Sequence, residues 1–190
     1  IKIPIYSLLF IGKKSNFAEH MKRNILMVYP EFPATYWSYE HSLPFIGKKS
    51  LQPPLGLMTV AAMLPDTFDV RLIDLNVSSD GLADGIMEAD LVFLSAMLVQ
   101  QDSFADVVRQ CNTAGTPVVA GGPYPISSRE KIEGVDHFVL DEAEITLPKF
   151  IADYEQGRAQ SVYTSGGEKP DLSLTPIPRF DIIDVNAYQM

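Results

Sequence analysis

The sequence predicts a doubly wound α/β fold, in which helices cover both faces of a parallel sheet. Short runs typical of buried strands alternate five times with segments of helical character. One of these runs, Thr116-Pro117-Val118-Val119-Ala120, opens directly into Gly121-Gly122-Pro123. Because such alternation requires parallel strands joined by right-handed crossovers, we expect a five-stranded sheet in the order 2-1-3-4-5.

The expected strands span residues 25–29, 70–74, 91–96, 117–120 and 137–140. The third is an apolar run, as expected for a strand buried on both faces. A long loop, 30–54, follows the first strand and is rich in aromatic residues, among them Tyr36 and Trp37. Loops of this length inside compact domains are usually functional.

The expected helices span residues 55–64, 81–88, 103–113, 128–133 and 147–154. Pro65 stops the first, Gly115 ends the third, and Ser127 or Ser128 caps the fourth. Together with the strands, these helices predict a flavodoxin-like (Rossmann-like) arrangement.

The chain divides into three regions on composition. We interpret residues 1–20 as an upstream extension or a non-native segment; its Phe-Ile-Gly-Lys-Lys-Ser recurs at 45–50. Residues 21–158 form the predicted domain. Residues 159–190 contain two adjacent glycines and three prolines, which is typical of a linker, and we expect no complete element after residue 180. The linker predicts a further domain beyond it.

Composition excludes several classes of function. The net charge of −9 argues against a nucleic-acid surface. The single cysteine, Cys111, cannot form an internal disulfide and fits a reducing, cytoplasmic location; we interpret it as a small apolar residue of the third helix. No stretch reaches the roughly 18 apolar residues that a membrane span needs.

The candidate site lies where the strands end, because ligands of open α/β sheets bind at the carboxyl ends of the strands. Two glycines at the end of a buried strand indicate that something approaches the backbone closely. A tight turn without a ligand is the alternative. The candidate binding residues are Tyr36, Trp37, Leu75, Asn76, Ser95, Met97, Gly121, Gly122, Pro123, Tyr124, Glu142 and Glu144.

This edge lacks what most catalytic sites need. No histidine follows the first four strands at a position suited to a general base, and no phosphate-binding glycine motif or cysteine cluster is present. We therefore expect a binding platform for a large, flat, partly apolar ligand, with neither catalytic nor metal-ligating residues. Structural alternatives remain: Ser95 as a helix cap, Asn76 as a turn residue, Glu142 and Glu144 at a helix N-terminus, and Trp37 packed on the domain's own surface.

The order and spacing of several short segments resemble the N-terminal cobalamin-binding domain of radical S-adenosylmethionine enzymes. The resemblance is to the branch described as magnesium-protoporphyrin monomethyl ester oxidative cyclase-like, with hopanoid methylases as relatives. The matching segments are Val28-Tyr29-Pro30-Glu31-Phe32-Pro33, Tyr36-Trp37-Ser38, Pro53-Pro54-Leu55-Gly56-Leu57, Val70-Arg71-Leu72-Ile73-Asp74-Leu75-Asn76, Ser95-Ala96-Met97, Val119-Ala120-Gly121-Gly122-Pro123, Glu142-Ala143-Glu144-Ile145-Thr146-Leu147 and Pro176-Ile177-Pro178-Arg179-Phe180-Asp181.

The resemblance implies cobalamin as the ligand and methyl transfer or oxidative cyclisation of a tetrapyrrole or lipid-like substrate as the activity of the whole protein. It also implies a radical domain after Pro176-Ile177-Pro178-Arg179, which would hold an iron–sulfur cluster and S-adenosylmethionine. No such cysteine motif occurs in these 190 residues.

Two departures from the family pattern matter. Cobalamin domains of mutases carry Asp-x-His-x-x-Gly after the second strand, where the histidine ligates cobalt; here Asn76 occupies that position. An amide is a poor cobalt ligand beside an imidazole, so the resemblance implies cobalamin with its own base displaced and no protein histidine. Relatives more often read Gly-Glu-Gly-Glu where this chain has Asp141-Glu142-Ala143-Glu144. Without the two glycines, a ligand can approach the end of the fifth strand less closely.

Two other readings of the same fold remain. A signalling receiver domain needs an aspartate at the end of the third strand, where this chain has Ser95. A flavodoxin-like module that binds flavin needs a phosphate loop after the first strand, but Pro30 and Pro33 remove amide donors and Glu31 repels phosphate. A flavodoxin-like interaction module without a cofactor is therefore the main alternative.

Overall fold

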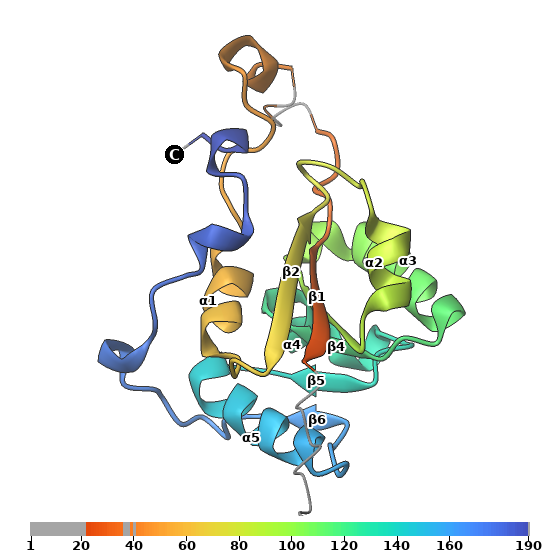
Figure 1. Ribbon diagram of the computed structural model, residues 1–190, viewed down its shortest axis with the longest axis vertical. Coiled ribbons are helices and arrows are strands. Elements are labelled where there is room, and N and C mark those ends of the chain that lie inside the picture. The colour runs from red at the N-terminus through yellow and green to blue at the C-terminus, as the bar shows by residue number, and fades with distance from the viewer. Residues whose placement is uncertain (1–21, 36–38, 40, 190) are drawn as a thin grey trace, which may run out of the picture.

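The sheet of the computed structural model has six parallel strands in the order β2-β1-β3-β4-β5-β6 (Figure 1). The structure describes residues 22–35, 39 and 41–189. The predicted order of the first five strands is confirmed, and a sixth, two-residue strand lies in the segment predicted as a linker. The strands are β1 (Arg23–Tyr29), β2 (Phe68–Asp74), β3 (Leu91–Ser95), β4 (Val118–Gly121), β5 (His137–Val139) and β6 (Val162–Tyr163).

Helices cover both faces of this sheet, as predicted. They are α1 (Leu55–Met63), α2 (Leu82–Glu88), α3 (Gln101–Ala114), α4 (Pro123–Ser128) and α5 (Ala143–Glu155). Buried side chains of α2, α3 and α4 pack on one face, and those of α1 and α5 pack on the other. Figure 1 shows α1 and α2 on opposite sides of β1 and β2.

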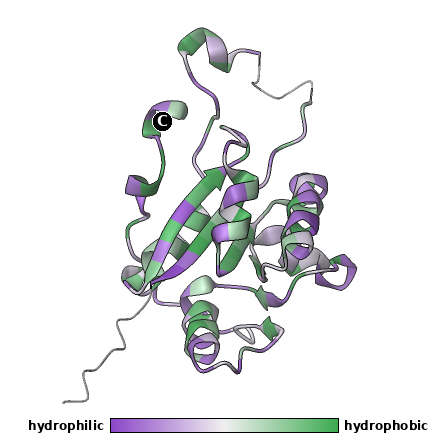
Figure 2. Ribbon diagram, turned by 45° about the vertical axis from the view of Figure 1, so that its right-hand side comes forward, coloured by the Kyte–Doolittle hydropathy of each residue, from purple (hydrophilic) through white to green (hydrophobic). Residues whose placement is uncertain are grey.

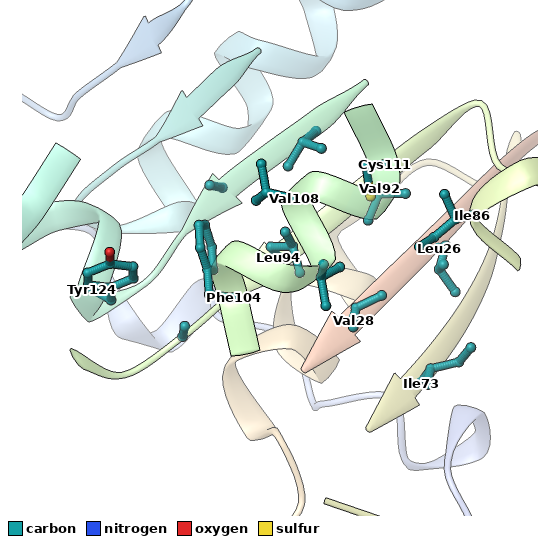
Figure 3. Close-up of a cluster of buried hydrophobic side chains, with 14 of the residues drawn as sticks. Leu26, Val28, Ile73, Ile86, Val92, Leu94, Phe104, Val108, Cys111 and Tyr124 are labelled. Carbon is teal, nitrogen blue, oxygen red and sulfur yellow. The ribbon is translucent and has the colours of Figure 1, made fainter. Parts of the chain in front are cut away.

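Alternate side chains of β1 enter the two cores, which explains why this strand reads as a continuous apolar run. Leu26 and Val28 face α2 and α3, whereas Ile25 and Met27 belong to the core beneath α1 and α5. Figure 2 shows the central strands mostly in the hydrophobic colour. In the first core, which lies beneath α2, α3 and α4, Cys111 is fully buried among apolar side chains, as predicted (Figure 3).

Two helix predictions are wrong in their bounds. The fourth helix begins at Pro123 rather than Ser128, because a proline after Gly122 is well suited to the first helical turn. Residues Arg129–Lys131 form only a 3-10 turn, so neither Ser127 nor Ser128 caps a helix there. The fifth helix begins at Ala143, one turn earlier than predicted, and continues through Pro148.

The C-terminal segment folds back against the domain. Two 3-10 turns, Phe180–Ile182 and Val185–Ala187, interrupt the stretch that we expected to carry no complete element. The Arg179 amide donates to the Met58 carbonyl of α1, and Tyr188 forms a parallel bridge with Ser50. Figure 1 shows this dark blue segment beside α1. Among the described residues, no helix has the length and apolar character to cross a membrane.

Candidate functional site

The glycine pair at the end of β4 is required by the neighbouring strands. A Cβ at Gly121 would lie 2.8 Å from the carbonyl oxygen of Val139 in β5. Gly122 has φ of 86°, and a Cβ there would lie 2.4 Å from Ser95 Oγ. The close approach that the sequence indicated is therefore made by the protein itself, and the tight-turn reading accounts for both glycines.

The pair nevertheless leaves the end of β4 without side chains. Pro123 follows it on the surface. Tyr124 turns into the core, where its ring meets Phe104 edge-on at 5.4 Å and its amide donates to the Ala96 carbonyl (Figure 3). Tyr124 is 9% exposed, so it supports the edge from below. The end of β4 is thus partly exposed backbone without side chains.

Exposed apolar side chains occur after β3 and on α4. Met97, Leu98 and Val99 follow β3 and are 46%, 55% and 59% exposed; Ile126 of α4 is 46% exposed. Val99 also lines the cavity described below. Ser95 does not cap α3, because Gln100 precedes that helix and the 3-10 turn Leu98–Gln100 lies between them.

Asn76 connects the ends of β1 and β2. Its backbone N–H and its Nδ2 donate to Asp74 Oδ1 at 2.9 and 2.7 Å. Nδ2 also donates to the Pro30 carbonyl at 3.1 Å, and Oδ1 accepts the Phe32 amide at 2.8 Å. Both amide donors are thus committed to the protein, as the turn reading expects. Leu75, beside it, packs against the first core.

Sequence reasoning did not single out Asp74, Gln100 and Tyr188. Burial raises the pKa of Asp74, and hydrogen bonds from Asn76 and Tyr188 oppose that rise. The Tyr188 hydroxyl donates to Asp74 Oδ2 at 2.9 Å. Gln100 is buried, donates to the Pro30 carbonyl and accepts the Met97 amide. Nothing in the local pattern around Tyr188 could have revealed a partner in β2.

The two acidic candidates lie at the N-terminus of α5, as the structural alternative expected. Glu142 precedes the helix and pairs with Lys169 Nζ at 3.0 Å, and Glu144 accepts the Thr175 hydroxyl at 2.8 Å. Both carboxylates thus hold the segment after β6. Asp141 has a positive φ of 62°, the conformation that glycine adopts without strain.

A cavity of about 640 Å³ lies at the β1 and β2 side of the same edge. Its volume is typical of small-molecule sites. Of the predicted residues that the structure describes, Asn76 alone lines it; Tyr36 and Trp37 lie outside the described residues. The remaining wall comes mainly from the long loop after β1, including Phe32, Lys49 and Leu51.

Comparison with known proteins identifies the domain. The model of the B12 binding domain matches residues 49–151. A methyltransferase of Synechocystis sp., itself uncharacterized, is 41% identical over 165 residues, which cover 86% of this chain and 30% of that protein. Hopanoid C-2 methylase of Rhodopseudomonas palustris is 29% identical over 171 residues, which cover 87% of this chain and 32% of that protein. The chain spans about a third of the length of these relatives. With more than half of its residues matched, the chain belongs to the B12-binding domain family.

Proposed function

We propose that this chain binds cobalamin at the carboxyl edge of its sheet, as one module of a larger radical S-adenosylmethionine enzyme. One observation carries the proposal: β4 ends in two residues without side chains, and the segment after β3 and helix α4 carry the exposed apolar side chains Met97, Leu98, Val99 and Ile126. Membership of the B12-binding family supports the identity of the ligand.

The residues at this edge fit a corrin, which is large, flat and partly apolar. Gly121 and Gly122 offer backbone without a Cβ, and Met97 offers an exposed apolar side chain. Ser95, Leu75 and Glu142 are partly exposed on the neighbouring strand ends, where they would contact the periphery of the cofactor. When bound, cobalamin supplies a cobalt that carries a methyl group or accepts an electron; the domain supplies position and a dry face.

We propose that cobalt receives no protein histidine. Asn76 stands at the position of the family's histidine, and its amide is held by Asp74, Pro30 and Phe32. His137, at the start of β5, uses Nδ1 to contact the Gln160 carbonyl. We propose in addition that cobalamin binds with its own base displaced.

The activity of the whole protein is also a proposal. One relative is named a methyltransferase and the other a hopanoid methylase. We propose methyl transfer or oxidative cyclisation on a tetrapyrrole or lipid-like substrate, in the cytoplasm. The iron–sulfur cluster and S-adenosylmethionine would belong to a radical domain in the same polypeptide, outside these 190 residues.

Titration of the purified chain with hydroxocobalamin tests the proposal. We expect the visible spectrum to change to that of the base-off form, and the pigment to elute with the protein on gel filtration. An unchanged spectrum with no co-elution contradicts cobalamin binding by this chain. A protein that ignores both cobalamin and flavin would favour the alternative, a flavodoxin-like interaction module without a cofactor.

A further inference from the structure

The C-terminal segment 184–189 is bonded to residues that line the edge cavity. The Lys49 and Ser50 amides donate to the Ala187 carbonyl at 2.8 and 3.1 Å, and the Gln189 amide donates to the Ser50 carbonyl at 3.0 Å. Lys49 and Ser50 in turn line the cavity. The segment therefore holds the long loop from outside through a single parallel bridge.

Tyr188 connects the C-terminal segment to the interior of the domain. Its side chain is 2% exposed, and its hydroxyl donates to Asp74 Oδ2, joining positions 114 residues apart. The other carboxylate oxygen of Asp74 accepts two hydrogen bonds from Asn76. A continuous set of hydrogen bonds thus leads from the C-terminal segment through Asp74 to Asn76.

The same set of bonds ends at the loop after β1. Asn76 holds the Pro30 carbonyl and the Phe32 amide. Gln100 also holds Pro30, and the Glu31 amide donates to Ser103 Oγ at 2.9 Å, so the loop has anchors on the β3 side as well. Phe32 and Asn76 both line the cavity. Losing the Tyr188 bond should therefore loosen this loop without releasing it.

We propose that Tyr188 is a positioning residue: through Asp74 and Asn76 it couples the C-terminal segment to the shape of the cofactor edge. The expected effect of Tyr188 on cobalamin affinity rests on the function proposed above. The coupling between the C-terminal segment and the loop after β1 does not depend on the cofactor. A merely structural role would lower global stability and leave the loop at Phe32 no more open than the rest of the domain.

The chain provides a matched control. Tyr163 is also a buried tyrosine, and its hydroxyl donates to buried Asp153 at 3.0 Å. That pair joins β6 to α5, and no bond among the described residues links it to Tyr188, Asp74 or Asn76. Tyr188→Phe and Tyr163→Phe therefore each remove a buried hydroxyl that donates to an aspartate. The Tyr163 hydroxyl also accepts the Gln160 amide, and Asp153 pairs with Arg158, so Tyr163→Phe removes one hydrogen bond more. Only Tyr188→Phe should affect the loop after β1.

The experiment measures residue-resolved hydrogen exchange and hydroxocobalamin affinity in the 190-residue chain. We expect Tyr188→Phe to lower the protection of the Phe32 amide by about three- to tenfold and to weaken hydroxocobalamin binding by a similar factor. Tyr163→Phe should leave both unchanged. Equal effects of the two variants, or no effect of Tyr188→Phe on Phe32, would overturn the proposal.

Two further arms keep the test decisive. If the unaltered chain does not bind hydroxocobalamin, the proposed function fails, while the exchange at Phe32 still decides the coupling. If Tyr188→Phe does not fold, Asp184→Ala replaces it: Asp184 is exposed and accepts the Asn186 amide within the segment. That variant should also lower protection at Phe32, by a smaller factor, and an unchanged amide there would count against the proposal.

Discussion

Gly122 lies against Ser95: a Cβ added at Gly122 would come within 2.4 Å of the Ser95 hydroxyl. Ser95 is the last residue of β3 and pairs with Gly121, the last residue of the neighbouring strand β4, and Gly122 follows directly. The glycine pair and Ser95 are thus one packed unit before any ligand arrives. The absence of side chains at the end of β4 thus results from strand packing.

Gly122→Ala should destabilise the unliganded chain by about 1–3 kcal/mol, because its backbone conformation suits only glycine and its Cβ would meet Ser95. Ser95→Ala removes the nearest atom, so the double variant should lose less stability than the sum of the two single variants. Urea unfolding measures all three. Gly115→Ala is the control. Gly115 also has a positive φ, but a Cβ added there would meet nothing within 4 Å. This variant should show no coupling to Ser95→Ala.

Gly121→Ala tests the second contact of the pair. Its Cβ would lie 2.8 Å from the backbone oxygen of Val139, which cannot rotate away, so β4 and β5 must separate. We expect a loss of about 1–3 kcal/mol without any ligand. Gly56→Ala in α1 should instead be neutral or slightly stabilising, because a Cβ added at Gly56 would meet nothing within 4 Å. An unliganded Gly121→Ala chain as stable as the original would mean that only a ligand explains this glycine.

The sequence predicted the elements whose periodicity is strong and missed those set by tertiary contacts. β1 and β3 enter two cores, so their apolar runs identified them. β6 has two residues, too few to show a pattern. Asn76 was predicted from its place after β2. Tyr188 was not, because only the folded chain brings it to Asp74 across 114 residues.

Cys111 should be unreactive in the folded protein. Burial raises the pKa of its thiol to about 11, and its side chain is fully covered. Because the thiolate is the reactive species, iodoacetamide at pH 8 should label only the unfolded fraction of the chain. Mass spectrometry across a urea series should show labelling that follows the unfolded fraction. Rapid labelling without urea would show that α3 opens locally.

Asp141 adopts a backbone conformation that suits glycine, at a cost that its side chain offsets. Its positive φ is unfavourable for residues other than glycine by about 1–2 kcal/mol, although aspartate tolerates it better than most. Its Oδ2 accepts the Ser165 amide at 2.9 Å and the Ser165 hydroxyl at 3.3 Å. Asp141→Ala loses these bonds and keeps the strain, so it should unfold at lower urea than Asp141→Gly. The reverse order would contradict this account, and Ser165→Ala isolates the hydroxyl bond.

Asp74 should make the stability of the domain depend on pH. Burial raises its pKa above the ordinary 3.8, so the folded chain keeps the proton at pH values where the unfolded chain has lost it. Unfolding then releases a proton, and stability falls as pH rises from about 3.8 through the folded pKa. Asp74→Asn cannot ionise and lacks this contribution. The unfolding free energy of the original chain minus that of Asp74→Asn should therefore decrease between pH 4 and pH 7.

The difference between the two proteins isolates this carboxyl. Hydrogen bonds lower the pKa values of exposed Asp171 and Asp181, which gives the opposite pH dependence, but both residues are present in both proteins. Their contributions cancel in the subtraction. Urea unfolding at matched ionic strength provides the two free energies. A difference that stays constant from pH 4 to pH 7 would mean that Asp74 titrates in the folded chain as it does in the unfolded one, and that Asn76 and Tyr188 fully compensate its burial.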